Sequence, residues 1–166
     1  MHRMPTLFWL FSLIAFLVFL IYTNLYLPAY VNVIGEDKLL EKANYFYITL
    51  AIGVLLNGSL LLLGGALHFV PSFLMPIPKR TEWMEDERKR KKLYLNLKSW
   101  LKGLGVCFNL FLIASIIDIY DNNDTDIYVP TSWMFVLVGV LTLAWLTTYF
   151  FWFRHLPTEE ELQIVQ

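Results

Sequence analysis

Residues 45–69 read YFYITLAIGVLLNGSLLLLGGALHF and contain no Asp, Glu, Lys or Arg. A helix needs about 20 apolar residues to cross the roughly 30 Å hydrocarbon layer of a membrane, and this stretch is long enough. Inside lipid the backbone must satisfy its own hydrogen bonds, and the stretch lacks the period-two alternation of a barrel strand. We therefore predict a transmembrane helix.

Three further apolar runs, at residues 6–27, 99–117 and 132–153, approach or reach the same length. The chain is 57% hydrophobic and 16% charged, whereas a typical soluble domain carries about 25% charged residues. The run at 6–27 is too long for the apolar part of a cleaved signal peptide, so we expect it to remain as the first span. The sequence thus predicts an all-α integral membrane protein, a single domain over residues 1–166 with four antiparallel transmembrane helices.

Positive charge is concentrated in one part of the chain. Residues 85–92 read EDERKRKK, and most of the 13 Lys and Arg residues lie between Lys79 and Lys102. Loops rich in Lys and Arg stay on the cytoplasmic side of a membrane. We therefore expect the loop at 70–98, the short tail at 154–166 and both termini to be cytoplasmic, with the third helix extended into the cytoplasm.

The order of the charges within this loop favours a helix. Thr81 is a preferred type of N-cap residue, and the acids precede the bases, which suits the helix dipole. The acids at 85–87 lie four residues before the bases at 89–91, a spacing that stabilises helices by roughly 0.2–0.5 kcal/mol per pair. Because no Pro or Gly lies between Thr81 and Trp100, we expect one helix to run from the loop into the third span.

Two functions are open for the basic cluster of Arg88, Lys89, Arg90, Lys91 and Lys92. In the simpler interpretation it only sets the orientation of the chain in the membrane. Clusters of this size beside a span also bind anionic lipid, although the neighbouring acids weaken that attraction. Nucleic acid is not an expected partner, because the net charge is -1 and the sequence has no nucleic-acid-binding motif.

Amides are the polar groups that stand out deep within the runs. Asn57 is central in the second run and Asn109 in the third, so in consecutive antiparallel helices they lie at similar depth. We predict that they contact each other, in a bond worth on the order of 1 kcal/mol. Packing is the simpler role for this pair, and contact with a transported or bound molecule is the alternative. The absence of ionisable residues at mid-depth argues against a proton relay.

Two histidines could hold a cofactor. His68 and His155 end the second and fourth runs, which places both on the expected cytoplasmic side. A pair of histidines can ligate haem or a metal, but these two lie at the membrane interface, where a haem would not be shielded. Cys107 is the single cysteine and excludes a thiolate cluster. We therefore expect no cofactor.

Two segments resemble a known family. Residues 27–42 read LPAYVNVIGEDKLLEK, and residues 75–91 read MPIPKRTEWMEDERKRK. They are similar to small bacterial membrane proteins of the domain-of-unknown-function family numbered sixteen forty-eight, a module that also forms the N-terminal part of the sporulation-delaying-protein immunity protein. The matching residues are Leu27, Pro28, Asn32, Gly35 and Asp37 in the first segment and Ile77, Pro78, Lys79 and Trp83 in the second. The family's histidine and second proline are missing from the first. The resemblance covers roughly residues 5–120 and implies a bacterial inner-membrane protein without an assigned reaction.

The first outward loop is the main candidate for recognition. Pro28 ends the first helix, Asn32 and Gly35 suit a turn, and residues 36–42 suit a short helix that enters the second span. A turn that rests on the bilayer is the simpler interpretation. The immunity analogy supports the alternative, in which Pro28, Asn32, Gly35 and Asp37 recognise an external peptide or partner.

The sequence contains no GxSxG, HExxH or Gly-rich phosphate loop, so we do not expect an enzyme. The predicted function is that of a non-catalytic membrane protein, either an immunity or signal-type module or an accessory subunit. Its expected partners are the lipid bilayer and other membrane protein subunits. The alternative is a small transporter or a haem-binding electron-transfer subunit.

Overall fold

The computed structural model describes residues 3–33, 39–123, 131–158 and 162. Four long helices dominate these residues, and each is long and apolar enough to cross a membrane. They are α1 (Arg3–Tyr26), α2 (Lys42–Ala66), α4 (Glu87–Asn123) and α5 (Ser132–Arg154). The all-α class is thereby confirmed, as is the prediction of four helices long and apolar enough to span a membrane.

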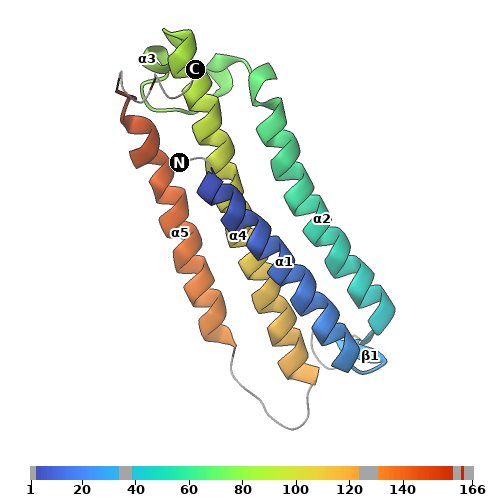
Figure 1. The fold of residues 1–166 in the computed structure, drawn as a ribbon. Helices are drawn as coiled ribbons and strands as arrows, with labels where there is room; N and C mark the ends of the chain where they lie inside the picture. The colour runs from blue at the N-terminus through green and yellow to red at the C-terminus, as the bar shows by residue number, and fades with distance from the viewer. Residues whose placement is uncertain (1–2, 34–38, 124–130, 159–161, 163–166) are drawn as a thin grey trace.

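Helix α4 is the centre of the fold. It contacts α1, α2 and α5, and Figure 1 shows α1 crossing it while α2 and α5 lie to either side. The helix is longer than the apolar run at 99–117, because it also includes the basic residues before that run and a polar turn after it. One long helix therefore organises the other three.

A small hairpin joins α1 to α2. Its strands are β1 (Tyr30–Asn32) and β2 (Leu39–Glu41), which are antiparallel with Val31 opposite Leu40. The prediction of a short helix at residues 36–42 is wrong for 39–41, and 34–38 lie outside the described residues. A strand forms there because it pairs with β1 and turns Leu40 toward the cluster in which the fully buried Val31 of β1 packs with Leu27 and Tyr45.

The loop after α2 contains two 3₁₀ turns and a short helix. These are η1 (Leu67–Phe69), η2 (Ser72–Leu74) and α3 (Arg80–Met84). The expected continuous helix from Thr81 to Trp100 is wrong, because the chain breaks between α3 and α4. Thr81 is also not the N-cap, since α3 follows Lys79, whose φ is 55°.

Asp86 explains the break. Its carboxylate accepts the backbone N–H of Arg88 at 2.9 Å and also binds the Arg88 guanidinium, so it acts as a cap for α4. The backbone N–H of Arg88 favours the carboxylate and lowers the pKa of Asp86. The predicted pair of Glu85 and Lys89 does form, at 3.3 Å.

The break lets α3 turn its tryptophan inward. Trp83 is 1% exposed, and its indole N–H donates to the carbonyl of Phe153 at the end of α5, at 2.9 Å. The cluster around it ties the loop to α4 and α5 and consists of Met75, Ile77, Trp83, Leu93, Leu97 and Phe153. Two residues of the second family-like segment, Ile77 and Trp83, therefore have a packing role.

Helices α4 and α5 are joined by a pair of tryptophans. The indole N–H of Trp145 donates to the carbonyl of Trp100 at 3.1 Å, and that of Trp100 donates to the carbonyl of Trp145 at 3.4 Å. The Trp145 ring lies directly on Gly103, where a Cβ atom would overlap it. The two helices can approach this closely only because residue 103 has no side chain.

We predict that Gly103→Ala destabilises the protein by about 1–3 kcal/mol, because the Trp145 indole is held by its hydrogen bond and cannot move away without strain. Thermal unfolding in detergent measures the effect. The matched control is Gly139→Ala, where a Cβ would meet nothing within 4 Å, and alanine there should not destabilise. Equal unfolding temperatures for the two variants would contradict the proposed contact.

Candidate functional site

Polar side chains from three helices meet in the interior. Ser12 of α1, Asn57 of α2 and Asn109 of α4 are 7%, 5% and 0% exposed. The indole of Trp9, one turn before Ser12, lies beside them. In a helix that crosses lipid, such groups have no water to bind and must pair within the protein.

These side chains form a closed ring of hydrogen bonds. Asn57 Nδ2 donates to Asn109 Oδ1 at 2.8 Å, and Asn109 Nδ2 donates to Ser12 Oγ at 2.9 Å. Ser12 Oγ donates to the backbone carbonyl of Trp9 at 2.8 Å, and Trp9 Nε1 donates to Asn57 Oδ1 at 2.9 Å, which closes the ring. Asn57 Nδ2 also donates to the carbonyl of Gly53 at 2.9 Å. The two amides are thus in the contact that their depth predicts, and we call the four side chains the amide ring.

Glycines admit the bulky side chains of α1. A Cβ at Gly105 would lie 2.7 Å from Trp9 Cδ1, and one at Gly53 would lie 2.5 Å from Phe16 Cε1. Two glycines of α2, Gly53 and Gly64, are buried. Gly58 and Gly65 have open space instead.

Sequence reasoning missed the α1 half of the ring. In the sequence, Trp9 is one of several aromatic residues near a predicted membrane boundary, and Ser12 is a small uncharged residue within an apolar run. A usable signal is the helical spacing of Ser12, Phe16 and Leu20, all of which are buried on one face. That face predicts which side of α1 meets the other helices.

The ring has little chemistry of its own. Its members are an indole, a hydroxyl and two amides, none of which titrates near neutral pH. Their hydrogen bonds are directed at one another rather than at an open path. The arrangement therefore serves to fix the register of α1, α2 and α4.

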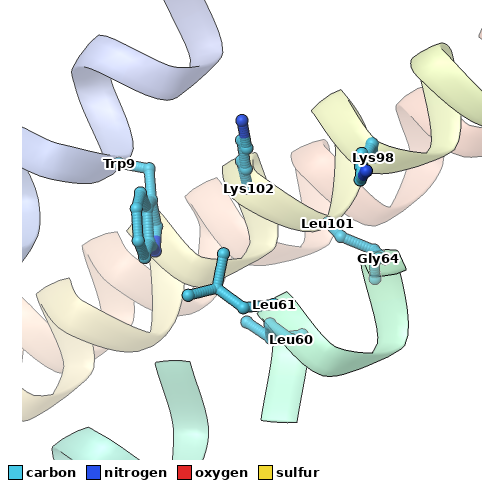
Figure 2. A pocket seen from close by; sticks show the side chains of 7 residues that line it. All are labelled: Trp9, Leu60, Leu61, Gly64, Lys98, Leu101 and Lys102. Atoms are coloured by element: carbon cyan, nitrogen blue, oxygen red, sulfur yellow. The ribbon is translucent and has the colours of Figure 1, made fainter. Parts of the chain in front are cut away.

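A small pocket lies beside the ring and shares Trp9 with it. Its cavity is about 30 Å³ and is lined by Trp9, Leu60, Leu61, Gly64, Lys98, Leu101 and Lys102. Figure 2 shows Lys98 and Lys102 on successive turns of α4, Trp9 reaching in from α1, and Leu60, Leu61 and Gly64 on α2. Lys102 Nζ donates to Thr6 Oγ1 at 2.8 Å. Neither lysine was singled out from the sequence.

The basic cluster and the two histidines lie apart from this ring. Arg88 is engaged by Asp86, and Lys89 by Glu85. His68 and His155 are both exposed, and the His68 ring packs on Tyr94 with 4.6 Å between ring centroids. Among the described residues no group of three or more His, Cys, Asp or Glu side chains could hold a metal ion.

The outward-loop residues have different surroundings. Pro28 is exposed, whereas Asn123 at the end of α4 clamps the backbone of Asn32, accepting from its N–H at 2.8 Å and donating to its carbonyl at 2.9 Å. The side-chain oxygen of Asn32 is buried and has no hydrogen-bond partner among the described residues. Gly35 and Asp37 lie outside the described residues.

We predict that the bond between Asn57 and Asn109 couples their contributions to stability. In a double-mutant cycle of Asn57→Ala and Asn109→Ala, the interaction energy should be on the order of 1 kcal/mol. The free energy of unfolding in detergent measures it. Asn44→Ala removes an exposed amide of α2 and should change the stability by less than about 0.5 kcal/mol. Additive losses for the two interior variants would show that the amides do not act as a pair.

No family model matches this chain, and no curated protein or solved structure matches it. The family resemblance of residues 27–42 and 75–91 stays a hypothesis that rests on those two segments. In this fold the segments have packing roles, with Leu27 buried beside the hairpin and Ile77 and Trp83 buried beside α4 and α5.

Proposed function

We propose that this chain is a non-catalytic protein of a bacterial inner membrane that works by contact with other membrane proteins, as an accessory subunit or an immunity-type module. In this proposal the four long helices cross the membrane in antiparallel order. Both termini and the loop at 70–98 are cytoplasmic. The bacterial location and the immunity role rest on the family resemblance.

The amide ring is the observation that carries the non-catalytic part of the proposal. Trp9, Ser12, Asn57 and Asn109 are bonded to one another and include no titratable group. A transporter needs polar groups that can release their partners within the protein and bind a passing solute. A proton relay needs ionisable groups. Closed bonding of this kind supports a structural role for the interior.

The outer face of α5 supports function by contact. Helix α5 packs mainly on α4, and Val138 is buried there. On the other side it exposes a continuous apolar strip, which consists of Trp133, Val136, Leu137, Val140 and Leu141. The strip has no polar side chain, and in this proposal it is the surface on which a neighbouring transmembrane helix packs.

The charge distribution supports the orientation. Helix α3 and the ends of α2 and α5 lie at one end of the molecule, and the hairpin lies at the other (Figure 1). The basic residues at 79–102 cluster toward the α3 end. Under the positive-inside rule that end faces the cytoplasm.

Cysteine labelling in intact cells tests this orientation. In a Cys107→Ala background, Tyr30→Cys on the exposed hairpin should react with a membrane-impermeant maleimide added outside. Arg90→Cys, also exposed, should react only after the membrane is permeabilised. The reverse pattern would mean that the chain is inverted and would overturn the proposed topology.

Photo-crosslinking in the membrane tests function by contact. A photoreactive residue at Val140 should give one discrete heavier product, and the protein should co-purify with that partner at a fixed ratio in mild detergent. A probe at Val138, which is buried against α4, is the matched control and should give none. Solute uptake by liposomes that contain only this protein, or a haem absorption band on the pure protein, would instead favour a transporter or an electron-transfer subunit.

A further inference from the structure

The pocket between α1, α2 and α4 holds two lysines among apolar side chains. Lys98 and Lys102 are one helical turn apart on α4, so their charges lie on the same face. Among the residues that the structure describes, no acidic side chain lines the pocket, and the other lining residues are apolar or glycine: Trp9, Leu60, Leu61, Gly64 and Leu101. Two like charges beside a low-dielectric wall attract an anion strongly.

The position of the pocket restricts the anion. Lys98 and Lys102 flank the start of the third apolar run, the depth at which lysines extend toward lipid headgroups. Leu61 is 49% exposed and Leu62 is 75% exposed beside the pocket, so the surface next to it is apolar. A ligand with an anionic head and apolar chains fits both features.

We propose that the mouth of this pocket binds the phosphate of an anionic phospholipid, with Lys98 and Lys102 as its ligands and the acyl chains lying along the exposed leucines of α2. The cavity of about 30 Å³ is lined by the apolar stems of the two lysines and by their apolar neighbours, so the phosphate would lie outside it, against the ammonium groups. Basic pockets between transmembrane helices are typical sites for such headgroups.

The neighbouring glycine shapes the site. The Lys98 stem passes over Gly64, where a Cβ would lie 3.3 Å from Lys98 Cγ. Lys102 is held in place by its bond to Thr6 at 2.8 Å. The Lys98 stem thus lies against α2 and the Lys102 ammonium is bonded to α1, so a phosphate held by both lysines would link all three helices.

This site differs from the basic cluster that the sequence indicated. In that cluster Arg88 and Lys89 already have acidic partners, Asp86 and Glu85. Neutralised charges attract an anion less than the acid-free pair in the pocket. The pocket therefore offers a more selective lipid contact than the exposed cluster.

Native mass spectrometry of the full chain in detergent, titrated with phosphatidylglycerol or phosphatidylcholine, tests the proposal. The wild type should bind phosphatidylglycerol in preference. Lys98→Gln with Lys102→Gln keeps the polar stems but removes both charges, and affinity should fall roughly 30-fold if each lysine contributes the typical amount for a basic residue near a membrane surface. Arg88→Gln with Lys89→Gln removes the same charge from the basic cluster, where both cations already have acidic partners, and should have a much smaller effect.

Two further measurements keep the result interpretable. Phosphatidylglycerol should raise the unfolding temperature of the wild type but not of the pocket variant. If that variant does not fold, Lys98→Gln alone, at an exposed side chain, should still lose affinity about fivefold. Equal losses in the pocket and cluster variants, unchanged binding in the pocket variant, or displacement of the lipid by inorganic phosphate would each overturn the proposal.

Discussion

A polar side chain inside the hydrocarbon layer has no water to bind, and this constraint shapes the interior of the protein. Asn57 and Asn109 would be costly if either faced lipid alone. Placed at the same depth on α2 and α4, they satisfy each other, and Trp9 and Ser12 of α1 complete the ring. Because a shift of any one helix by a turn would break these bonds, the ring specifies how the three helices are aligned.

Close approach of the helices is the second requirement. Lipid tails are as apolar as leucine, so helix association in a membrane depends on tight packing and hydrogen bonds rather than on the exclusion of water. Gly103 and Gly105 of α4 supply flat surfaces on which Trp145 of α5 and Trp9 of α1 lie. The Trp145 indole also donates a hydrogen bond to α4, and the Trp9 indole donates one to Asn57 of α2. The combination of glycine and tryptophan places two partners on opposite parts of one helix.

The sequence predicted those features that depend on composition and short-range spacing. The four apolar runs, the depth of Asn57 and Asn109, and the pair of Glu85 and Lys89 follow from counting residues along a helix. The break at Asp86 was not predicted, because helix propensity favours continuity there, whereas in the structure Asp86 caps α4 and Trp83 is buried against Phe153. Tertiary contact overrode local preference.

The hairpin and the lysine pocket were missed for a related reason. The pairing of residues 39–41 with β1 accompanies the burial of Val31 beside Leu27. No local sequence pattern predicts this contact. In the sequence, Lys98 and Lys102 are two members of a basic region. The fold places them in a pocket beside α1 and α2. Both features arise where segments distant in sequence meet, and periodicity carries no information about such meetings.

Trp9 connects the two halves of the candidate site. Its indole N–H is fixed to Asn57, while its ring forms a wall of the pocket beside Lys102. In the proposed lipid complex, a wall that is already held in place would lose little conformational freedom, so the amide ring would lower the entropic cost of binding a headgroup. The reverse would also hold, since a phosphate that links α1, α2 and α4 would stabilise the helix alignment that the ring requires. In this proposal the amide ring and the lipid site therefore stabilise each other.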